Sequence, residues 1–189
     1  IYIHWPFCRS KCPYCDFASE PAKNVDFRAW QKAYARSLES YAARTADKTV
    51  SSIFFGGGTP SLMTAQMVSF AIETIRSLWP VEKNAEISLE ANPCSIDLPK
   101  MQAFEKAGVN RLSVGIQALN DRDLKFLGRL HTVGQALDVL ENARQIFSRV
   151  SADFIYGRPG QSLRDWHEEL EKILELNLKH LSLYQLTIE

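Results

Sequence analysis

A regular alternation of strand-like and helix-like segments constrains the fold of this chain more than any other feature. Six short runs rich in apolar and β-branched residues are each bounded by turn residues, which is typical of buried strands. These runs are Ile1–His4, Ser52–Phe55, Glu86–Glu90, Arg111–Gly115, Ser151–Ile155 and His180–Tyr184. Because repeated strand–helix units pair their strands in parallel and place the helices outside, the pattern predicts an α/β fold with a parallel sheet.

Helical periodicity occupies segments between these runs. Apolar side chains recur at intervals of three and four over residues 27–41, 67–78 and 163–174, which predicts helices with core-facing stripes. Asp97 is expected to cap a further helix, with Gly108 as its C-terminal stop.

Length and composition describe a domain with a sizeable core. A complete eight-stranded barrel takes roughly 250 residues, whereas this chain has 189 and shows six strands. We therefore expect a partial (β/α)6 TIM-like barrel, a single core domain over residues 1–189 that was cut from a longer protein before a C-terminal domain. The formal net charge is zero, which gives no support for a nucleic-acid-binding surface. No stretch of about 18 apolar residues predicts a transmembrane helix, and no signal peptide is visible.

Three cysteines near the start of the chain carry the strongest chemical signal. Cys8, Cys12 and Cys15 have the spacing C-x3-C-x2-C. Three thiolates can hold three corners of a cubane [4Fe–4S] cluster and leave the fourth iron open to a small molecule. A structural zinc site normally closes with four ligands in two pairs, and here the second pair is missing. A disulfide framework is disfavoured, because three cysteines in one compact turn cannot pair fully. An exposed cluster and free thiols favour a reducing compartment, so we expect a cytoplasmic protein.

Other residues with chemical potential follow the predicted strands at one edge of the sheet. In parallel β/α architectures, functional groups gather at the C-terminal ends of the strands. In chain order, the candidates are the cysteine loop, Gly56-Gly57-Gly58-Thr59-Pro60, Glu90, Gln117, Asp153 and Tyr156–Gly160. We therefore expect these groups to converge on one site.

Each candidate also has a simpler structural interpretation. Three consecutive glycines can leave amides free to donate to a ligand, or they can form a tight strand-to-helix turn. Glu90 can accept two ribose hydroxyls or form an internal salt bridge. Gln117 offers a donor and an acceptor, and Arg129 offers a fork for a carboxylate, although each alone is more typical of a surface or cap residue. His131 and Cys94 are most simply structural. Taken together, the groups match a ligand with an amino-acid head and a nucleoside tail, such as S-adenosylmethionine.

The full set of motifs resembles the radical S-adenosylmethionine superfamily, and within it the oxygen-independent coproporphyrinogen III oxidases and their close relatives. The motifs are Cys8-x3-Cys12-x2-Cys15 with Tyr14, Tyr2–Cys8, Phe55–Pro60, Glu90-x-Asn92-Pro93, Gly115–Gln117 and Asp153–Gly157. The resemblance assigns the three cysteines to a [4Fe–4S] cluster. It assigns contacts with S-adenosylmethionine to Tyr2, Tyr14, Gly57, Gly58, Thr59, Glu90, Gln117, Arg129 and Asp153.

The resemblance also implies a chemistry and marks a departure from it. In the superfamily, the reduced cluster cleaves S-adenosylmethionine to methionine and a 5′-deoxyadenosyl radical, which in the oxidases starts the decarboxylation of a propionate. The oxidases have a fourth cysteine two residues after the third, where this chain has Phe17. This pattern is similar to the branch of haem chaperones, which bind haem and deliver it to haem proteins. We therefore expect a haem chaperone, with an oxygen-independent coproporphyrinogen III oxidase as the alternative, so that enzymatic activity stays open.

The same resemblance implies a set of partners. These are haem or a porphyrinogen, a reductant protein and recipient haem proteins, with membrane contact only where the recipient is membrane-bound. One further departure is Arg158, which stands where the family usually has an apolar residue. The sequence offers no functional reason for this arginine.

Overall fold

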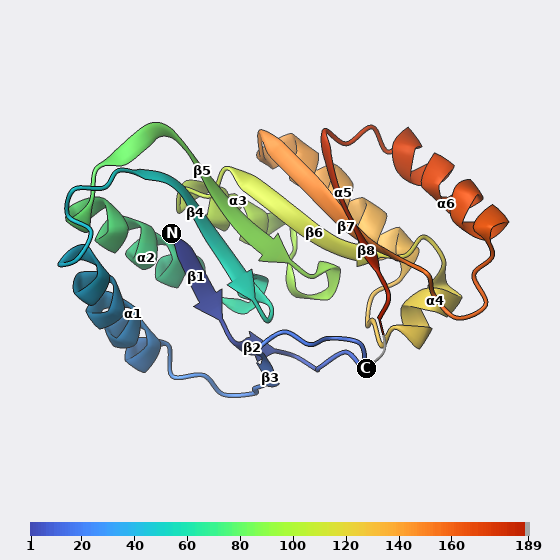
Figure 1. The fold of residues 1–189 in the computed structure, drawn as a ribbon, viewed down its shortest axis with the longest axis horizontal. Helices are drawn as coiled ribbons and strands as arrows, with labels where there is room; N and C mark the ends of the chain where they lie inside the picture. Colours follow the sequence, from blue (N-terminus) through green and yellow to red (C-terminus); the bar gives the residue numbers. More distant parts are fainter. Residues whose placement is uncertain (188–189) are drawn as a thin grey trace.

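The computed structural model describes residues 1–187 and contains one curved sheet of six strands (Figure 1). Its strands are β1 (Tyr2–Trp5), β4 (Val50–Gly57), β5 (Val81–Ala91), β6 (Arg111–Gln117), β7 (Arg149–Tyr156) and β8 (His180–Gln185). They lie side by side in chain order, and every neighbouring pair is parallel. The predicted partial barrel of six parallel strands is confirmed.

Helices occupy the connections between the strands and lie along the outer side of the curved sheet (Figure 1). They are α1 (Phe27–Ala42), α2 (Ala65–Leu78), α3 (Leu98–Lys106), α4 (Asp121–Phe126), α5 (Val133–Ile146) and α6 (Leu163–Glu175), with short 3-10 turns η1 (Pro60–Leu62) and η2 (Pro93–Ser95). All six helices begin with a side-chain oxygen that accepts a backbone amide of the first turn. The capping residues are Asp26, Thr64, Asp97, Asn120, Thr132 and Ser162.

The predicted core-facing stripes are only partly buried. Tyr41, Leu163 and Leu174 are 58%, 89% and 61% exposed, so the prediction is wrong at these ends of α1 and α6. α6 lies beyond β8, the last strand of the sheet (Figure 1). Among the described residues, no further strand lies beside α6 to bury these side chains. Ile173 is its fully buried apolar contact with the core.

The two faces of the sheet differ sharply in chemistry. Ile3, Phe55, Leu89 and Leu112 form one continuous row across four strands, and each is at most 4% exposed beneath the helices. Residues of the opposite parity point to the concave side. There Glu90, Ser113 and Ser151 form one row, and Gly115, Asp153 and Ser182 form the next. In closed barrels of this kind, branched apolar side chains normally pack the interior. The polar concave face here lines an open site instead.

A second, two-stranded sheet was not predicted. β2 (Phe7–Cys8) pairs in parallel with β3 (Glu20–Pro21) just beyond the end of β1. Backbone bonds from Glu20 to Pro6 at 2.8 Å and from Ala22 to Cys8 at 3.1 Å close the base of the cysteine loop. This small sheet therefore fixes where the loop leaves and rejoins the barrel.

Candidate cofactor site

A cleft of about 770 Å³ opens at the C-terminal ends of the strands. The predicted site residues on its wall are Cys8, Cys12, Cys15, Tyr14, Gly58, Thr59, Glu90, Gln117, Arg129 and Asp153. Two predicted residues, Tyr2 and Gly57, do not line it. Tyr2 lies on the concave face with its side chain 57% exposed and its hydroxyl 3.3 Å from Nδ1 of His4. The expected convergence is observed for the cysteine loop, Glu90, Gln117 and Asp153, whereas the Tyr156–Gly160 turn does not line the cleft. The role of each residue stays a prediction.

The cysteine loop is held at several points. Cys8 is buried in β2, while Cys12 and Cys15 are half-buried, and all three thiols are free. The amide of Cys15 donates to the carbonyl of Cys12 at 3.1 Å, which makes a tight turn. His4 Nε2 donates to the carbonyl of Ala18 at 2.8 Å and so ties the far end of the loop to β1.

Two of the three sulfurs accept hydrogen bonds from the barrel. Thr59 Oγ1 donates to Cys8 Sγ at 3.4 Å, and Arg129 Nη1 donates to Cys12 Sγ at 3.7 Å. Hydrogen bonds to cluster sulfurs are one of the ways a protein sets a cluster's reduction potential. Among residues 1–187, no three histidine, cysteine or acidic side chains converge on a single point as a lone metal ion would require.

The glycine turn behaves differently from its prediction. The amide of Gly57 donates to Glu90 Oε2 at 3.2 Å, that of Gly58 to Trp5 at 2.6 Å, and that of Thr59 to Phe7 at 2.9 Å. Of the two interpretations, the structure therefore shows the tight turn, because neighbouring groups of the protein already accept these amides.

The glycines serve a close approach between β4 and the cysteine loop instead. Gly57 has a φ of 115°, which L side chains rarely adopt. A Cβ at Gly58 would lie 2.8 Å from the Phe7 carbonyl oxygen and 3.0 Å from Cys8 Sγ. Only a residue without a side chain lets the turn pack this tightly against the first cysteine.

Two carboxylates face the cleft without a cationic partner. Among the described residues, neither Glu90 nor Asp153 forms an ion pair with a lysine or arginine. Burial and then the charge of Asp153 raise the pKa of Glu90 to about 7, against the opposing effects of the Gly57 amide and of Arg111. Burial also raises the pKa of Asp153, although hydrogen bonds from Ser182 and Ser113 oppose the shift. The internal salt bridge considered for Glu90 is not observed in this part of the chain.

Arg129 connects the cysteine loop with β6. Its Nη2 donates to the Gly115 carbonyl at 3.0 Å, and its Nη1 donates to the Tyr14 hydroxyl at 3.4 Å as well as to Cys12. Its buried Nε has no protein partner. Burial raises the pKa of Tyr14 to about 12, so its hydroxyl stays protonated near neutral pH. Gln117 ends β6 with a φ of 77°, a left-handed conformation that is uncommon outside glycine.

Sequence reasoning missed several residues of the site. Ser113 Oγ lies 3.2 Å from both carboxylate oxygens of Asp153. The strand register could have indicated Ser113, because it pairs with Glu90 and so shares the concave face. Tyr184 and Gln185, at the end of β8, also line the cleft, and the rule that places chemistry at strand ends could have found them. Phe17 lines the cleft as well and is 52% exposed.

Comparisons with known proteins give this geometry a context. The model of the radical SAM superfamily matches residues 2–173. A mouse protein, radical S-adenosyl methionine domain-containing protein 1, mitochondrial, is 40% identical over the whole chain, which covers 43% of that protein. Heme chaperone HemW of Escherichia coli is 38% identical over the whole chain, which covers 50% of it. The chain spans about half the length of the curated relatives it matches.

A solved structure shows the same fold. Coproporphyrinogen III oxidase (HemN) from Escherichia coli, a radical SAM enzyme, superposes with a TM-score of 0.82 at 28% identity. The match covers 98% of this chain and 43% of that protein. In the part of this chain that the structure describes, no helix has the length and apolar character needed to span a bilayer.

Proposed function

Since this chain belongs to the radical S-adenosylmethionine superfamily, we propose that it is the cofactor-binding core of a haem chaperone. Such a protein binds haem and delivers it to target haem proteins. One observation carries the choice: the side chain two residues after the third cysteine is the phenyl ring of Phe17, and it lines the cleft. Identity of 38% to a heme chaperone over the whole chain supports the same choice.

Members of the superfamily bind a [4Fe–4S] cluster and S-adenosylmethionine. Membership therefore confirms the two predicted cofactors. The residues present fit them, because three free thiols line the same cleft as two carboxylates and a buried arginine nitrogen without a partner. When bound and reduced, the cluster supplies the electron that cleaves the sulfonium of S-adenosylmethionine.

The protein's own side chains hold the two cofactors and orient them. Cys8, Cys12 and Cys15 hold the cluster, and the bonds from Thr59 and Arg129 to two of the sulfurs stabilise the thiolate charge.

The remaining side chains suit the two ends of the ligand. Glu90 and Asp153 have carboxylate oxygens left to accept ribose hydroxyls. Arg129, which lines the cleft, offers its guanidinium to the carboxylate of the amino-acid head. Gln117 offers a donor and an acceptor from the next strand end.

The proposal also covers the partners and the cellular compartment of the whole protein. Residues 1–189 act as one core domain of a longer protein that binds haem or a porphyrinogen, receives electrons from a reductant protein and passes haem to recipient proteins. The zero net charge favours no nucleic-acid partner. A reducing compartment such as the cytoplasm suits its free thiols, and membrane contact arises only through a membrane-bound recipient.

A second function has one specific observation in its favour. The barrel superposes closely on coproporphyrinogen III oxidase (HemN), at a TM-score of 0.82. An oxygen-independent oxidase would convert coproporphyrinogen III to protoporphyrinogen IX. Phe17 is the feature against it, because it replaces the fourth cysteine by which we distinguish the oxidases.

One experiment separates the two functions. The full-length protein is reconstituted with its cluster without oxygen, reduced, and given S-adenosylmethionine with coproporphyrinogen III. In parallel it is loaded with haem and mixed with an apo-haem protein. We expect haem transfer and no protoporphyrinogen IX. Protoporphyrinogen IX formed over many turnovers would reverse the assignment, and Phe17→Cys serves as the matched variant that tests whether the ring itself excludes the oxidase reaction.

A further inference from the structure

Three successive carbonyls at the end of β6 are each held by a side chain from another segment. Arg129 donates to the carbonyl of residue 115 at 3.0 Å, His131 to that of 116 at 3.1 Å, and Arg158 to that of 117 at 3.4 Å. The third carbonyl belongs to Gln117, whose backbone is left-handed. A non-glycine residue keeps such a conformation only where its surroundings hold it in place.

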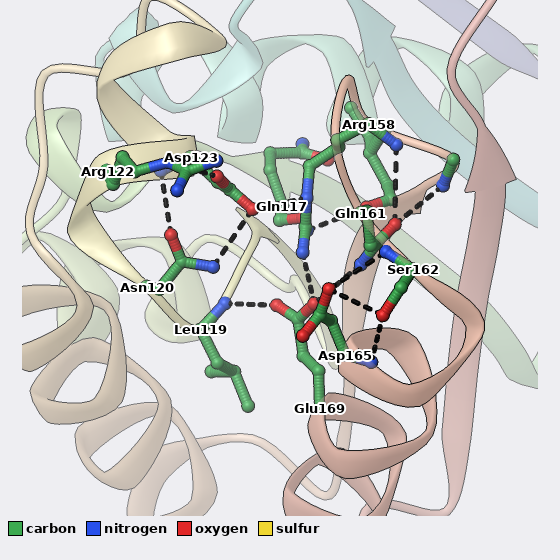
Figure 2. Close-up of polar contacts among 12 residues, drawn as sticks. Gln117, Leu119, Asn120, Arg122, Asp123, Arg158, Gln161, Ser162, Asp165 and Glu169 are labelled. Carbon is green, nitrogen blue, oxygen red and sulfur yellow. Dashed lines mark hydrogen bonds and ion pairs between the residues drawn. The ribbon is translucent and has the colours of Figure 1, made fainter.

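Arg158 lies at the centre of a network of polar contacts around this corner (Figure 2). It is 4% exposed, and its Nη1 also donates to the Ile155 carbonyl at 2.9 Å. Its Nε lies 2.8 Å from Asp123 Oδ2, and its Nη2 forms an ion pair with Glu169 of α6. Both Nη nitrogens therefore donate hydrogen bonds to groups from different elements, while Nε contacts Asp123 as an ion pair without a hydrogen bond.

Glu169 holds the other side of the same corner. It is 7% exposed, and its Oε1 accepts the amide of Leu119 at 2.7 Å. Gln161 supports the pair by donating to Glu169 Oε2 at 3.1 Å while its own Oε1 accepts the amide of Gly157 at 2.8 Å. The ion pair thus binds a carbonyl at 117 through its cation and an amide at 119 through its anion (Figure 2).

We propose that Arg158 is a positioning residue for Gln117. Together with Glu169 it clamps the corner at residues 117–119, so that the Gln117 side chain faces the cleft in one orientation. This inference rests on the proposed binding of S-adenosylmethionine in that cleft. Stability alone is a weak reason for such a pair, because apolar replacements of buried ion pairs are often as stable. A clamp explains why both charges contact the backbone of one corner.

The test is a double-mutant cycle on the full-length, cluster-loaded protein. Three variants are compared. The first combines Arg158→Met with Glu169→Met and so removes both charges of the ion pair, the second is Gln117→Ala, and the third carries all three changes. The dissociation constant for S-adenosylmethionine is measured by calorimetry, and the spectrum of the reduced cluster is recorded with and without S-adenosylmethionine. Arg164→Met is the matched control, because it breaks the exposed Arg164–Glu168 pair of 2.9 Å on the same helix.

We expect the charge-free pair to keep its iron and to bind S-adenosylmethionine about tenfold more weakly, the usual scale for losing a supporting contact behind a site. In the Gln117→Ala background the same change should have no further effect, and Arg164→Met should match the wild type. Unchanged affinity in the iron-loaded charge-free variant would overturn the inference. Losses that multiply with Gln117→Ala, or a Gln117→Ala variant of normal affinity, would overturn it while leaving the proposed function standing. A loaded wild type that does not bind S-adenosylmethionine would remove both.

Discussion

At the residue scale, the cleft contains two kinds of side chain. Thr59 Oγ1 and Arg129 Nη1 donate to cysteine sulfurs, and Arg129 Nη2 donates to the Gly115 carbonyl, so both side chains support the cysteine loop. Glu90 and Asp153 instead keep carboxylate oxygens turned to the cleft with no cationic partner among the described residues. Leaving two half-buried acids without counter-charges costs stability, and such acids are typical of sites that bind a ligand.

The first prediction concerns the cysteine loop. Cys12→Ala should abolish cluster assembly, because three thiolates are the fewest that hold the cluster while leaving one iron open. The fold should survive, since Cys12 is only half-buried in a loop. Iron content and circular dichroism after anaerobic reconstitution measure the two effects. Cys94→Ala is the control and should retain its iron, and wild-type iron content in the Cys12 variant would refute the cluster assignment.

The second prediction concerns the stability of the cofactor-free protein. Because the folded-state pKa of Glu90 is raised from 4.5 to about 7, the folded state binds more protons than the unfolded state between these values. The free energy of unfolding should therefore fall as the pH rises through this window. At pH values above 7, Glu90→Gln should raise the free energy of unfolding by up to about 3 kcal/mol, at about 1.4 kcal/mol per pKa unit. Urea unfolding at pH 5 and pH 8 tests this, and an equal gain at both values would contradict it.

The third prediction concerns the affinity for S-adenosylmethionine, which should rise with pH where the free energy of unfolding falls. An ionised Glu90 accepts ribose hydroxyls better than a protonated one, so S-adenosylmethionine should bind more tightly as the pH rises through about 7. Calorimetry on the cluster-loaded protein measures the profile. Glu90→Gln should bind more weakly and lose this pH dependence, and a variant that keeps the wild-type profile would remove Glu90 from the site.

At the scale of elements, β4 and the cysteine loop approach each other through one glycine. Gly58→Ala would place its Cβ 2.8 Å from the Phe7 carbonyl and 3.0 Å from Cys8 Sγ. We expect a loss of about 1–3 kcal/mol in the free energy of unfolding, as is usual for overpacking, together with reduced iron content. Gly134→Ala in α5 is the control, because its nearest neighbour would be 3.9 Å away, and it should stabilise by about 0.5–1 kcal/mol. Full iron loading in the Gly58 variant would count against the close approach.

The elements also show what a sequence can and cannot predict. The barrel strands were predictable because their short apolar runs, as in β4, β6 and β7, face the helices, and β8 shows a similar run of residues although none of them is buried. β5 begins at Val81 rather than at Glu86, because Glu82, Lys83 and Asn84 extend it as exposed polar residues that carry no strand pattern. β2 and β3 have two residues each, too few for any periodicity. The fate of the glycine amides depended on acceptors far along the chain, so only the structure could show it.

At the scale of the whole molecule, one face of the sheet packs against the helices and the other lines the cleft. Leu112 is fully buried between the sheet and its helices. Leu112→Ala should cost about 2–5 kcal/mol of the free energy of unfolding. Leu163→Ala, at an 89% exposed position, should change it by less than about 0.5 kcal/mol. Urea denaturation of the two variants tests the division, and similar losses would show that α6 is covered in solution.

The site as a whole was more predictable than its parts. The rule that chemistry gathers at strand ends correctly brought the cysteine loop, Glu90, Gln117 and Asp153 to one cleft. The supporting contacts were not predictable, because Arg158 and Glu169 meet only after α4, β7 and α6 have packed together. A departure from a family pattern pointed to Arg158, yet only its partners in the structure give it a role.

The order of the chain has a consequence for how this protein is made. The cysteine loop lies near the start of the sequence, whereas Arg129, which donates to Cys12 Sγ, comes 117 residues later. Chains leave the ribosome from the N-terminus at about 5–20 residues per second. The three oxidisable thiols are therefore in solution for several seconds before the side chains that shelter them have been translated. We therefore expect cluster insertion to follow the translation of Arg129.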